Sequence, residues 1–376
     1  MAITPPMRIA ISCRSLEYAS GGVKEYLVSL LNELLAIDTR NTYVLMHSQV
    51  QYFGSFPGAE EVSLYCSNRL LFDWLKLPAA LKKHDIDLAF FPSSNMPPRV
   101  PCKAVAAMMD LGYFHGDQRM YRFADTLYMK RAMAYTARRA ERLLAISDHT
   151  RRDLVDILGV PDQKITVTHL AADDLYHQPV AEDEVMRLAR RHGLTRPFFL
   201  YTGNISPRKN LKALLEAFAA VKDRVDADLV VTGGLSWGDG WKDWVASLGV
   251  ADRVHRLGYV ERQDMPALYA ACLAYVFPSL FEGFGLPVLE AQAVGAPVIC
   301  STATSLPEVA GDSALMIDPL DIPGISKALA DVADAQTGPA LRESLTQKGR
   351  ANARRFSWRD TAQKTLDVFE QVHRGE

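Results

Sequence analysis

Short apolar runs rich in β-branched residues alternate with longer amphipathic stretches along the chain. In the first half, the candidate strands are Arg8–Ser12, Tyr43–Met46, Leu88–Phe91 and Leu143–Ile146. Helical periodicity fills the gaps between them, as in Val23–Ala36. This alternation predicts β-α units whose strands pair in parallel and are buried on both faces by helices.

A polar stretch at Ala171–Leu194 interrupts the pattern, and a second β-α series follows it. The candidate strands of this series are Phe198–Thr202, Leu229–Thr232, Val254–Leu257, Ala274–Phe277, Pro297–Cys300 and Ala314–Ile317. The chain has 376 residues, which is more than one hydrophobic core usually serves. We therefore expect an α/β protein with two Rossmann-like, doubly wound parallel-sheet lobes and a cleft between them. The first lobe is predicted to cover residues 1–177 and the second residues 178–355.

Charge and composition exclude several classes of function. The net charge of −2 gives the chain no general attraction to nucleic acid, so we expect no nucleic-acid partner. The five cysteines show neither CxxC nor Cys/His spacing, which predicts reduced thiols rather than disulfides or a zinc site. The N-terminus lacks the pattern of a signal peptide, and no apolar run is long enough to span a membrane. These features predict a cytoplasmic protein.

Two glutamates, Glu282 and Glu290, stand eight positions apart inside the otherwise apolar run Tyr275–Cys300. The run reads as a strand, a loop and a helix, and ligands of parallel sheets collect beyond the carboxyl ends of the strands. We expect Glu282 in the loop and Glu290 in the first turn of the helix. Gly283 and Gly285 would let a ligand approach the backbone, and the helix N-terminus favours anions.

A pair of cations, Arg208 and Lys209, follows another predicted strand in the same lobe. The strand runs into Gly203 and Asn204, and a helix is expected to begin near Asn210. Cations in such a turn are suited to receiving an anionic leaving group.

These motifs resemble those of a known family. The segment Glu282-GFGLPVL-Glu290 is similar to the Glu-x7-Glu motif of retaining glycosyltransferases of family 4, which have the GT-B fold. The similarity continues through GAPVICSTATSLPEVAGDSALMIDPLD. The resemblance implies that Glu290 holds the ribose of a nucleotide-sugar donor and that Arg208 and Lys209 contact its diphosphate. The residues implied to surround the donor sugar and diphosphate are Glu282, Gly283, Phe284, Gly285 and Leu286.

The resemblance extends to other parts of the donor site. Gly21 and Gly22 resemble the family's glycine-rich first loop, which lies near the diphosphate and the transferred sugar. The residues expected near the donor base are Gly233, Gly234, Gly258, Tyr259 and Val260. Similarity in the PRKN and SLPEV segments favours GDP-mannose, as in bacterial O-antigen and exopolysaccharide mannosyltransferases, and UDP-glucose or another UDP-sugar is the alternative. The terminal helix, predicted at Phe356–Val372 within residues 356–376 with Ser357 as its cap, resembles one that packs back on the first lobe.

The first lobe departs from the family at one position. After the strand AVAAM the family usually has His-Asp-Leu, whereas Met109 stands here in the histidine position, with Asp110 and then His115 following. Asp110, His115, Ser147 and Arg151 are the candidates for the acceptor side. The acceptor implied by the resemblance is a glycan or a lipid-linked saccharide. Basic and aromatic residues alternate in the helix predicted within residues 119–142, which leaves a peripheral membrane contact and an ordinary solvated surface as alternatives.

We expect neither a metal nor another cofactor. Two Asp-x-Asp triplets, Asp85-Ile86-Asp87 and Asp226-Ala227-Asp228, immediately precede strands, so they are predicted to be strand-entry turns away from the site. Arg208 and Lys209 would neutralise the charge that a divalent cation neutralises in other glycosyltransferases. The alternatives left open are an epimerase or a phosphorylase of the same fold and a binding module that has lost catalysis.

Overall fold

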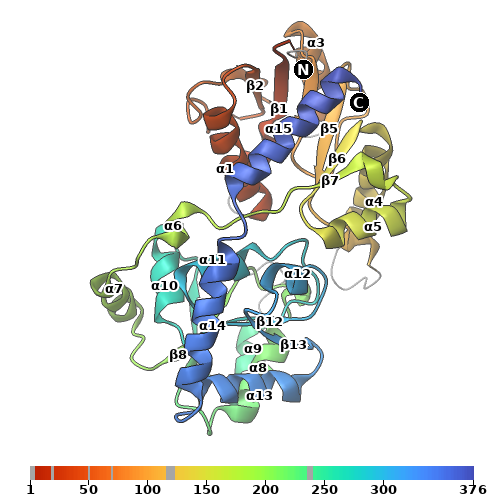
Figure 1. The fold of residues 1–376 in the computed structure, drawn as a ribbon. Helices are drawn as coiled ribbons and strands as arrows, with labels where there is room; N and C mark the ends of the chain where they lie inside the picture. Colours follow the sequence, from red (N-terminus) through yellow and green to blue (C-terminus); the bar gives the residue numbers. More distant parts are fainter. Residues whose placement is uncertain (1–4, 18–20, 50, 69–70, 116–122, 235–239) are drawn as a thin grey trace. The chain divides into compact units, whose positions relative to one another are not determined.

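The computed structural model describes residues 5–17, 21–49, 51–68, 71–115, 123–234 and 240–376 (Figure 1). The chain divides into two compact units, each with its own sheet. Unit 1 comprises Met1–Leu170 and Ser357–Glu376, and unit 2 comprises Ala171–Phe356. Residues 171–177, which we had assigned to the first lobe, therefore belong to unit 2. Among the described residues, no helix is long and apolar enough to cross a membrane.

The sheet of unit 1 has seven parallel strands in the order β3-β2-β1-β4-β5-β6-β7. The strands are β1 (Arg8–Ser12), β2 (Thr42–His47), β3 (Glu60–Ser63), β4 (Leu88–Phe91), β5 (Lys103–Met108), β6 (Arg142–Ala145) and β7 (Ile165–Val167). The main helices are α1 (Gly22–Ile37), α3 (Leu77–Lys83), α4 (Phe123–Arg139), α5 (Asp148–Leu158) and α15 (Trp358–Arg374). The central strands are almost wholly buried, as expected for a parallel sheet covered on both faces.

The C-terminal helix α15 belongs to unit 1 and lies beside α1, blue next to red in Figure 1. Ser357 caps α15 by accepting a hydrogen bond from the backbone N–H of Asp360. The ring of Phe369 packs 5.3 Å from that of Phe90 on β4. Lys103 Nζ donates to the carbonyl oxygen of Val372 at 2.8 Å, where the exposed carbonyls of a helix end favour a cation. These contacts fix the end of the chain to the sheet on which its beginning lies.

The sheet of unit 2 has six parallel strands in the order β10-β9-β8-β11-β12-β13. The strands are β8 (Phe198–Thr202), β9 (Asp228–Thr232), β10 (Val254–Gly258), β11 (Ala274–Phe277), β12 (Val298–Ser301) and β13 (Leu315–Ile317). The helices are α6 (Asp174–His177), α7 (Glu182–His192), α8 (Leu211–Val221), α9 (Trp241–Ser247), α10 (Met265–Ala271), α11 (Leu286–Val294), α12 (Leu306–Ala310), α13 (Ile322–Ala333) and α14 (Gly338–Ala353).

The predicted alternation of strands and helices is confirmed. Each strand that we bounded from the sequence is present with its ends shifted by no more than one residue. β7 was not bounded from the sequence, and neither was β3, whose sequence EEVS contains no apolar run. It lies at the edge of the sheet and is partly exposed, so burial does not select apolar residues there.

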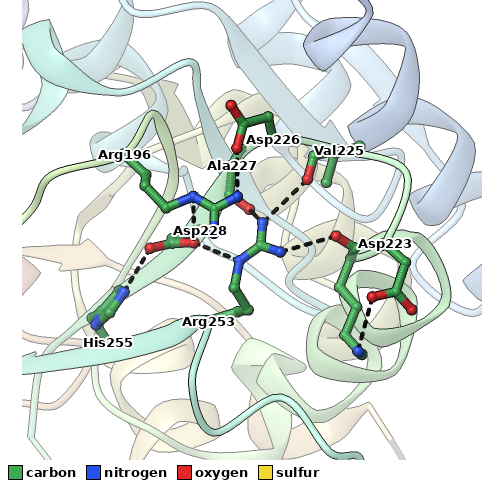
Figure 2. A network of polar contacts seen from close by, with 9 residues as sticks. Arg196, Asp223, Val225, Asp226, Ala227, Asp228, Arg253 and His255 are labelled. Carbon is green, nitrogen blue, oxygen red and sulfur yellow. Dashed lines mark hydrogen bonds and ion pairs between the residues drawn. The ribbon is translucent and has the colours of Figure 1, made fainter.

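The Asp226-Ala227-Asp228 triplet lies at the amino end of β9 and is part of a network of polar contacts (Figure 2). Asp228 accepts from Arg253 Nε at 2.6 Å and pairs with His255 Nε2 at 2.8 Å. Arg253 also donates to the carbonyl oxygen of Ala227 at 2.6 Å. The other triplet is at the amino end of β4, where Asp87 accepts from the backbone N–H of Arg8 at 2.8 Å. The prediction that both triplets are strand-entry turns is confirmed.

Arg253→Met is expected to destabilise unit 2. The side chains of Arg253 and Asp228 are only 13% and 10% exposed, and removing Arg253 leaves the buried Asp228 carboxylate with His255 and, at 3.7 Å, Arg196 as its remaining partners. A loss of about 3 kcal/mol corresponds to a fall of roughly 6–12 °C in the thermal midpoint of a unit of this size. Thermal unfolding followed by circular dichroism measures the change.

Asp226→Asn provides the matched control in the same triplet. The Asp226 side chain is 87% exposed, so its pair with Arg196 contributes little and the midpoint should stay within about 1–2 °C. Equal destabilisation by the two substitutions would contradict the structural role assigned to Arg253.

Candidate functional site

The carboxyl ends of three neighbouring strands in unit 2 are joined through glycine backbones. Gly203, after β8, donates its N–H to the carbonyl oxygen of Thr232 at 3.2 Å. Gly233, after β9, donates to the carbonyl oxygen of Gly258 at 2.7 Å. A Cβ atom on Gly233 would stand 2.1 Å from the oxygen of Gly203, and φ at Gly233 is +117°, so no other residue fits there. The predicted base-side residues therefore meet at one edge of the sheet, with Tyr259 largely exposed beside them.

The turn that carries the two predicted cations is held against the loop after β11. Pro207–Lys209 form one 3-10 turn, and Asn210 follows in the left-handed conformation with φ +56°. The side-chain amide of Asn210 donates to the carbonyl oxygens of Pro278 at 3.1 Å and Pro319 at 2.8 Å. The backbone N–H of Leu280 donates to the carbonyl oxygen of Arg208 at 2.8 Å. The two segments thus form one rigid edge, although 70 or so residues separate them in the sequence.

Glu282 lies between the two cations. Arg208 Nη1 is 3.0 Å from Glu282 Oε2, and Lys209 Nζ is 2.8 Å from Glu282 Oε1. Arg208 Nη1 also donates to the carbonyl oxygen of Phe281 at 2.5 Å, and Lys209 Nζ stands 4.4 Å from the ring centre of Phe277. The side chains of Glu282 and Lys209 are only 9% and 13% exposed, while that of Arg208 is 25% exposed. We call Arg208, Lys209 and Glu282 the ion triad.

The charge states within the ion triad are strongly biased. Burial acts to raise the pKa of Glu282, but the positive charges of Arg208 and Lys209 outweigh it and bring the pKa to about 2. Burial lowers the pKa of Lys209 from its ordinary value, and the attraction of Glu282 opposes that shift. Glu282 is therefore a carboxylate at neutral pH and is unsuited to delivering a proton. The triad carries one net positive charge.

The backbone around Glu282 is fixed by two hydroxyl side chains that we did not predict. Thr304 Oγ1 accepts from the N–H of Glu282 and donates to its carbonyl oxygen, each at 2.9 Å. Ser305 Oγ lies 2.9 Å from the carbonyl oxygen of Glu282 and 2.8 Å from that of Phe284. Both residues belong to the segment STATSLPEV, whose similarity to the family was the available signal. The position of Gly285 also favours glycine, because its φ is +108° and a Cβ there would stand 2.5 Å from a terminal methyl group of Leu306.

Glu290 lies further along α11 than expected. The helix begins at Leu286 with Pro287 in its first turn and ends at Gly295, as predicted, but Glu290 is its fifth residue and so lies beyond the first turn. The expected first-turn position is wrong, because the helix starts directly after Gly285. The hydroxyl of Tyr269 donates to Glu290 Oε2 at 3.3 Å. Burial raises the pKa of Tyr269 well above its ordinary value, so this hydroxyl remains a donor.

The candidate site residues of unit 1, which include Gly21 and Gly22 for the donor and Asp110 and Ser147 for the acceptor, have separate surroundings. Gly21 caps α1 with φ +138°, and Gly22 begins the helix. Asp110 Oδ1 accepts from the N–H of Gly112 at 2.8 Å in the turn after β5. Ser147 is fully buried and caps α5, where it accepts from the N–H of Thr150 at 3.0 Å. Ser147 therefore serves as the N-cap of α5.

Two further acceptor-side candidates contact carboxylates. Arg151 pairs with Asp162 through two hydrogen bonds of 2.7 and 2.6 Å. His115 Nε2 is 2.6 Å from Asp153 Oδ2. Contact of these residues with an acceptor stays a prediction.

An apolar groove of about 510 Å³ lies beside α4 in unit 1. Exposed apolar side chains surround it, including Trp74 at 57%, Phe123 at 77% and Tyr128 at 43% exposure. Arg131 and Asp73 also line the groove, so charged and apolar groups are combined on this surface. Residues 119–122 of the predicted basic helix lie outside the described residues.

Comparisons with known proteins agree with this architecture. Residues 20–174 match the family Glycosyltransferase Family 4, and residues 184–352 match the family Glycosyl transferases group 1. O-antigen chain mannosyltransferase B of Escherichia coli is 29% identical over 386 residues, covering 96% of this chain and 99% of that protein.

Two solved structures illustrate the likeness of fold. Sucrose-phosphate synthase of Thermosynechococcus elongatus matches with a TM-score of 0.79 at 19% identity, covering 98% of this chain and 100% of that one. HepE of Anabaena, in complex with UDP and glucose, matches with a TM-score of 0.76 at 18% identity, covering 97% and 100%. Together with the two parallel sheets, these likenesses confirm the predicted GT-B fold class.

Glu282→Gln is expected to lower stability in a pH-dependent way. The pKa of Glu282 is about 2 in the folded chain against an ordinary 4.5, so the ionised carboxylate stabilises the fold by about 3 kcal/mol above pH 4.5. This advantage over the Gln variant is lost as the pH falls from about 4.5 toward 2, because the protonated carboxyl then resembles the amide. Denaturant unfolding of both proteins across this range measures it.

Glu261→Gln is the control, because Glu261 is exposed in the same unit. Its effect should be small at every pH. A stability difference between wild type and Glu282→Gln that does not shrink on acidification would contradict the assigned charge states.

Proposed function

Because the chain belongs to glycosyltransferase family 4 and is a glycosyltransferase with the GT-B fold, we propose that unit 2 binds a nucleotide-diphosphate sugar. The proposed reaction transfers mannose from GDP-mannose to a glycan or lipid-linked saccharide acceptor in bacterial surface polysaccharide synthesis. The configuration at the anomeric carbon is retained in this proposal.

The ion triad is the observation that carries the proposal. Its net positive charge lies at the carboxyl edge of a parallel sheet, where ligands of this fold class bind. Arg208 offers a planar fork for phosphate oxygens and Lys209 a compact charge. We propose that these two residues bind the donor diphosphate and stabilise its charge as it leaves, in place of a divalent cation.

The remaining donor groups are assigned by their positions in unit 2. Glu290, oriented by the hydroxyl of Tyr269, is proposed to accept hydrogen bonds from the ribose hydroxyls. Gly233, Tyr259 and Val260 are proposed to lie against the base, and Gly203 and Asn204 near the phosphates. Gly283, Phe284, Gly285 and Leu286, held by Thr304 and Ser305, are proposed to surround the sugar.

A retaining reaction on this site has no evident protein nucleophile. Glu282, with a pKa of about 2 and both oxygens facing cations, is a poor proton acceptor and is engaged electrostatically. We propose a front-side displacement in which a leaving diphosphate oxygen takes the proton of the acceptor hydroxyl. The protein then contributes positioning and electrostatic stabilisation.

Two donors are supported by different observations. The E. coli relative that this chain matches over nearly its whole length is named a mannosyltransferase, which favours GDP-mannose. HepE, which shares the fold, is described in complex with UDP and glucose, which keeps UDP-glucose as the second candidate. The glycine backbones at the base side do not discriminate between guanine and uracil by side-chain chemistry.

Donor binding by the purified chain tests the proposal. GDP-mannose is expected to raise the thermal midpoint by several degrees at about 100 times its dissociation constant, and UDP-glucose less. Glu290→Ala and Lys209→Ala should each weaken donor binding by at least about tenfold, because each removes a charged contact. Differential scanning fluorimetry and isothermal titration calorimetry measure the two effects.

Lys212→Ala is the matched control, because Lys212 lies in the first turn of α8 and is 63% exposed. Its affinity for the donor should equal that of the wild type. If no nucleotide sugar raises the thermal midpoint, the proposed donor site is refuted. If UDP-glucose raises the midpoint more than GDP-mannose does, UDP-glucose is selected as the donor. Binding without transfer to any acceptor would favour a binding module.

We also propose that unit 1 contacts the membrane when the acceptor is lipid-linked. The surface formed by Trp74, Phe123, Leu127 and Tyr128 with Arg131 combines exposed apolar side chains with positive charge, as interfacial surfaces do. The double variant Trp74→Ser/Phe123→Ser should bind anionic phospholipid vesicles at least about tenfold more weakly than wild type, because two large apolar side chains are lost. Vesicle sedimentation measures the binding.

Leu320→Ser is the control for this surface, because Leu320 is as exposed as Phe123, at 77%, but belongs to unit 2. Its vesicle binding should be unchanged. Equal vesicle binding by the double variant and the wild type would contradict the membrane contact. The surface beside α4 would then be an ordinary solvated surface.

A further inference from the structure

Three side chains that bind metals in other proteins converge in unit 1. His115 Nε2 is 2.6 Å and His149 Nε2 3.5 Å from the same carboxylate oxygen, Oδ2 of Asp153. One ligand atom from each residue lies within 4.8 Å of those of the other two. The rings of the two histidines are 6.1 Å apart and inclined by 31°. The geometry thus directs two imidazole nitrogens and one carboxylate oxygen toward a common point.

Two separate elements supply these ligands. His149 and Asp153 are four residues apart on α5, so they lie on the same side of the helix one turn apart. The first turn of α5 is fixed by the Ser147 cap. His115 follows the 3-10 turn Gly112–Phe114 that comes after β5. The carboxyl ends of β5 and β6 therefore bring the three residues together.

The donor set favours one class of ion. Calcium and magnesium prefer oxygen ligands in larger numbers, whereas two imidazoles and one carboxylate suit zinc and neighbouring transition metals. His149 and Asp153, one turn apart on α5, can bind the same ion. His115, from the segment after β5, completes a three-ligand site. Such a site leaves a position for water or for a hydroxyl group.

We propose that His115, His149 and Asp153 form a binding site for one zinc-class divalent cation in unit 1. The Asp153 side chain is only 11% exposed and that of His149 17%, whereas His115, at 37%, lies toward solvent and gives an ion access. Binding replaces the imidazole–carboxylate contacts by metal–ligand bonds. It links the segment after β5 to α5, next to Asp110, and does not depend on the proposed donor site.

Cobalt(II) provides a spectroscopic probe for the metal-stripped full-length chain. We expect one equivalent of Co²⁺ to bind with visible absorption bands of a nitrogen- and oxygen-ligated ion, and Zn²⁺ to displace it. Zn²⁺ should also raise the thermal midpoint, because the site exists only in the folded chain. His115→Ala, His149→Ala and Asp153→Asn should each weaken Co²⁺ binding by about tenfold or more.

His177→Ala is the matched control, because His177 is an exposed histidine in unit 2 and its removal should leave Co²⁺ binding intact. Thermal unfolding without metal shows that each variant is folded, and His115→Ala, at the most exposed ligand, keeps the test valid if a helix variant unfolds. Sub-stoichiometric binding, or binding that His115→Ala leaves unchanged, would mean an adventitious ion only and would overturn the proposal.

Discussion

The proposed donor site in unit 2 depends on a carboxylate that is buried between two cations. Glu282 is 7% exposed, and an isolated carboxylate at that depth would become neutral rather than remain charged. Arg208 and Lys209 reverse that outcome, and the pKa of Glu282 falls to about 2. The cations depend on the glutamate in turn, since burial lowers the pKa of Lys209. The three charges therefore stabilise one another. Removing one of them would take away part of the attraction that offsets the desolvation cost of the others.

The sheet topology brings these charges together from distant parts of the chain. Arg208 and Lys209 follow β8, Glu282 follows β11, and β8 and β11 are neighbours in the sheet. Two parallel strands that are adjacent in space deliver their following loops to the same edge. Asn210 then joins the loops by donating to the carbonyl oxygens of Pro278 and Pro319. The order of strands, rather than the order of residues, defines the site.

Much of this arrangement could be predicted from the sequence, because buried parallel strands and helix ends leave clear patterns. The strands of both units, the Ser357 and Ser147 caps and the end of α11 at Gly295 carry such local signals. The edge strand β3 does not, since its exposed side chains follow no apolar pattern. The contacts of Thr304, Ser305 and Tyr269 were not predicted, because each joins residues some 20 positions apart, although the family-like segment STATSLPEV marked the region of Thr304 and Ser305. Glu290 was predicted in the first turn of α11, whereas it is the fifth helical residue, because the residue at which α11 begins was not evident.

The ion triad also constrains how a donor diphosphate would enter the proposed site. Both oxygens of Glu282 already face cations, so an incoming phosphate shares Arg208 and Lys209 with the carboxylate. Arg208 is the more exposed cation, at 25% against 13% for Lys209. An entering phosphate would therefore meet Arg208 first. Because Lys209 is held between Glu282 and the ring of Phe277, its charge acts at a fixed position. In the proposed reaction, such preorganised charge would stabilise the leaving diphosphate without rearrangement of the protein, so that no side chain need act as nucleophile.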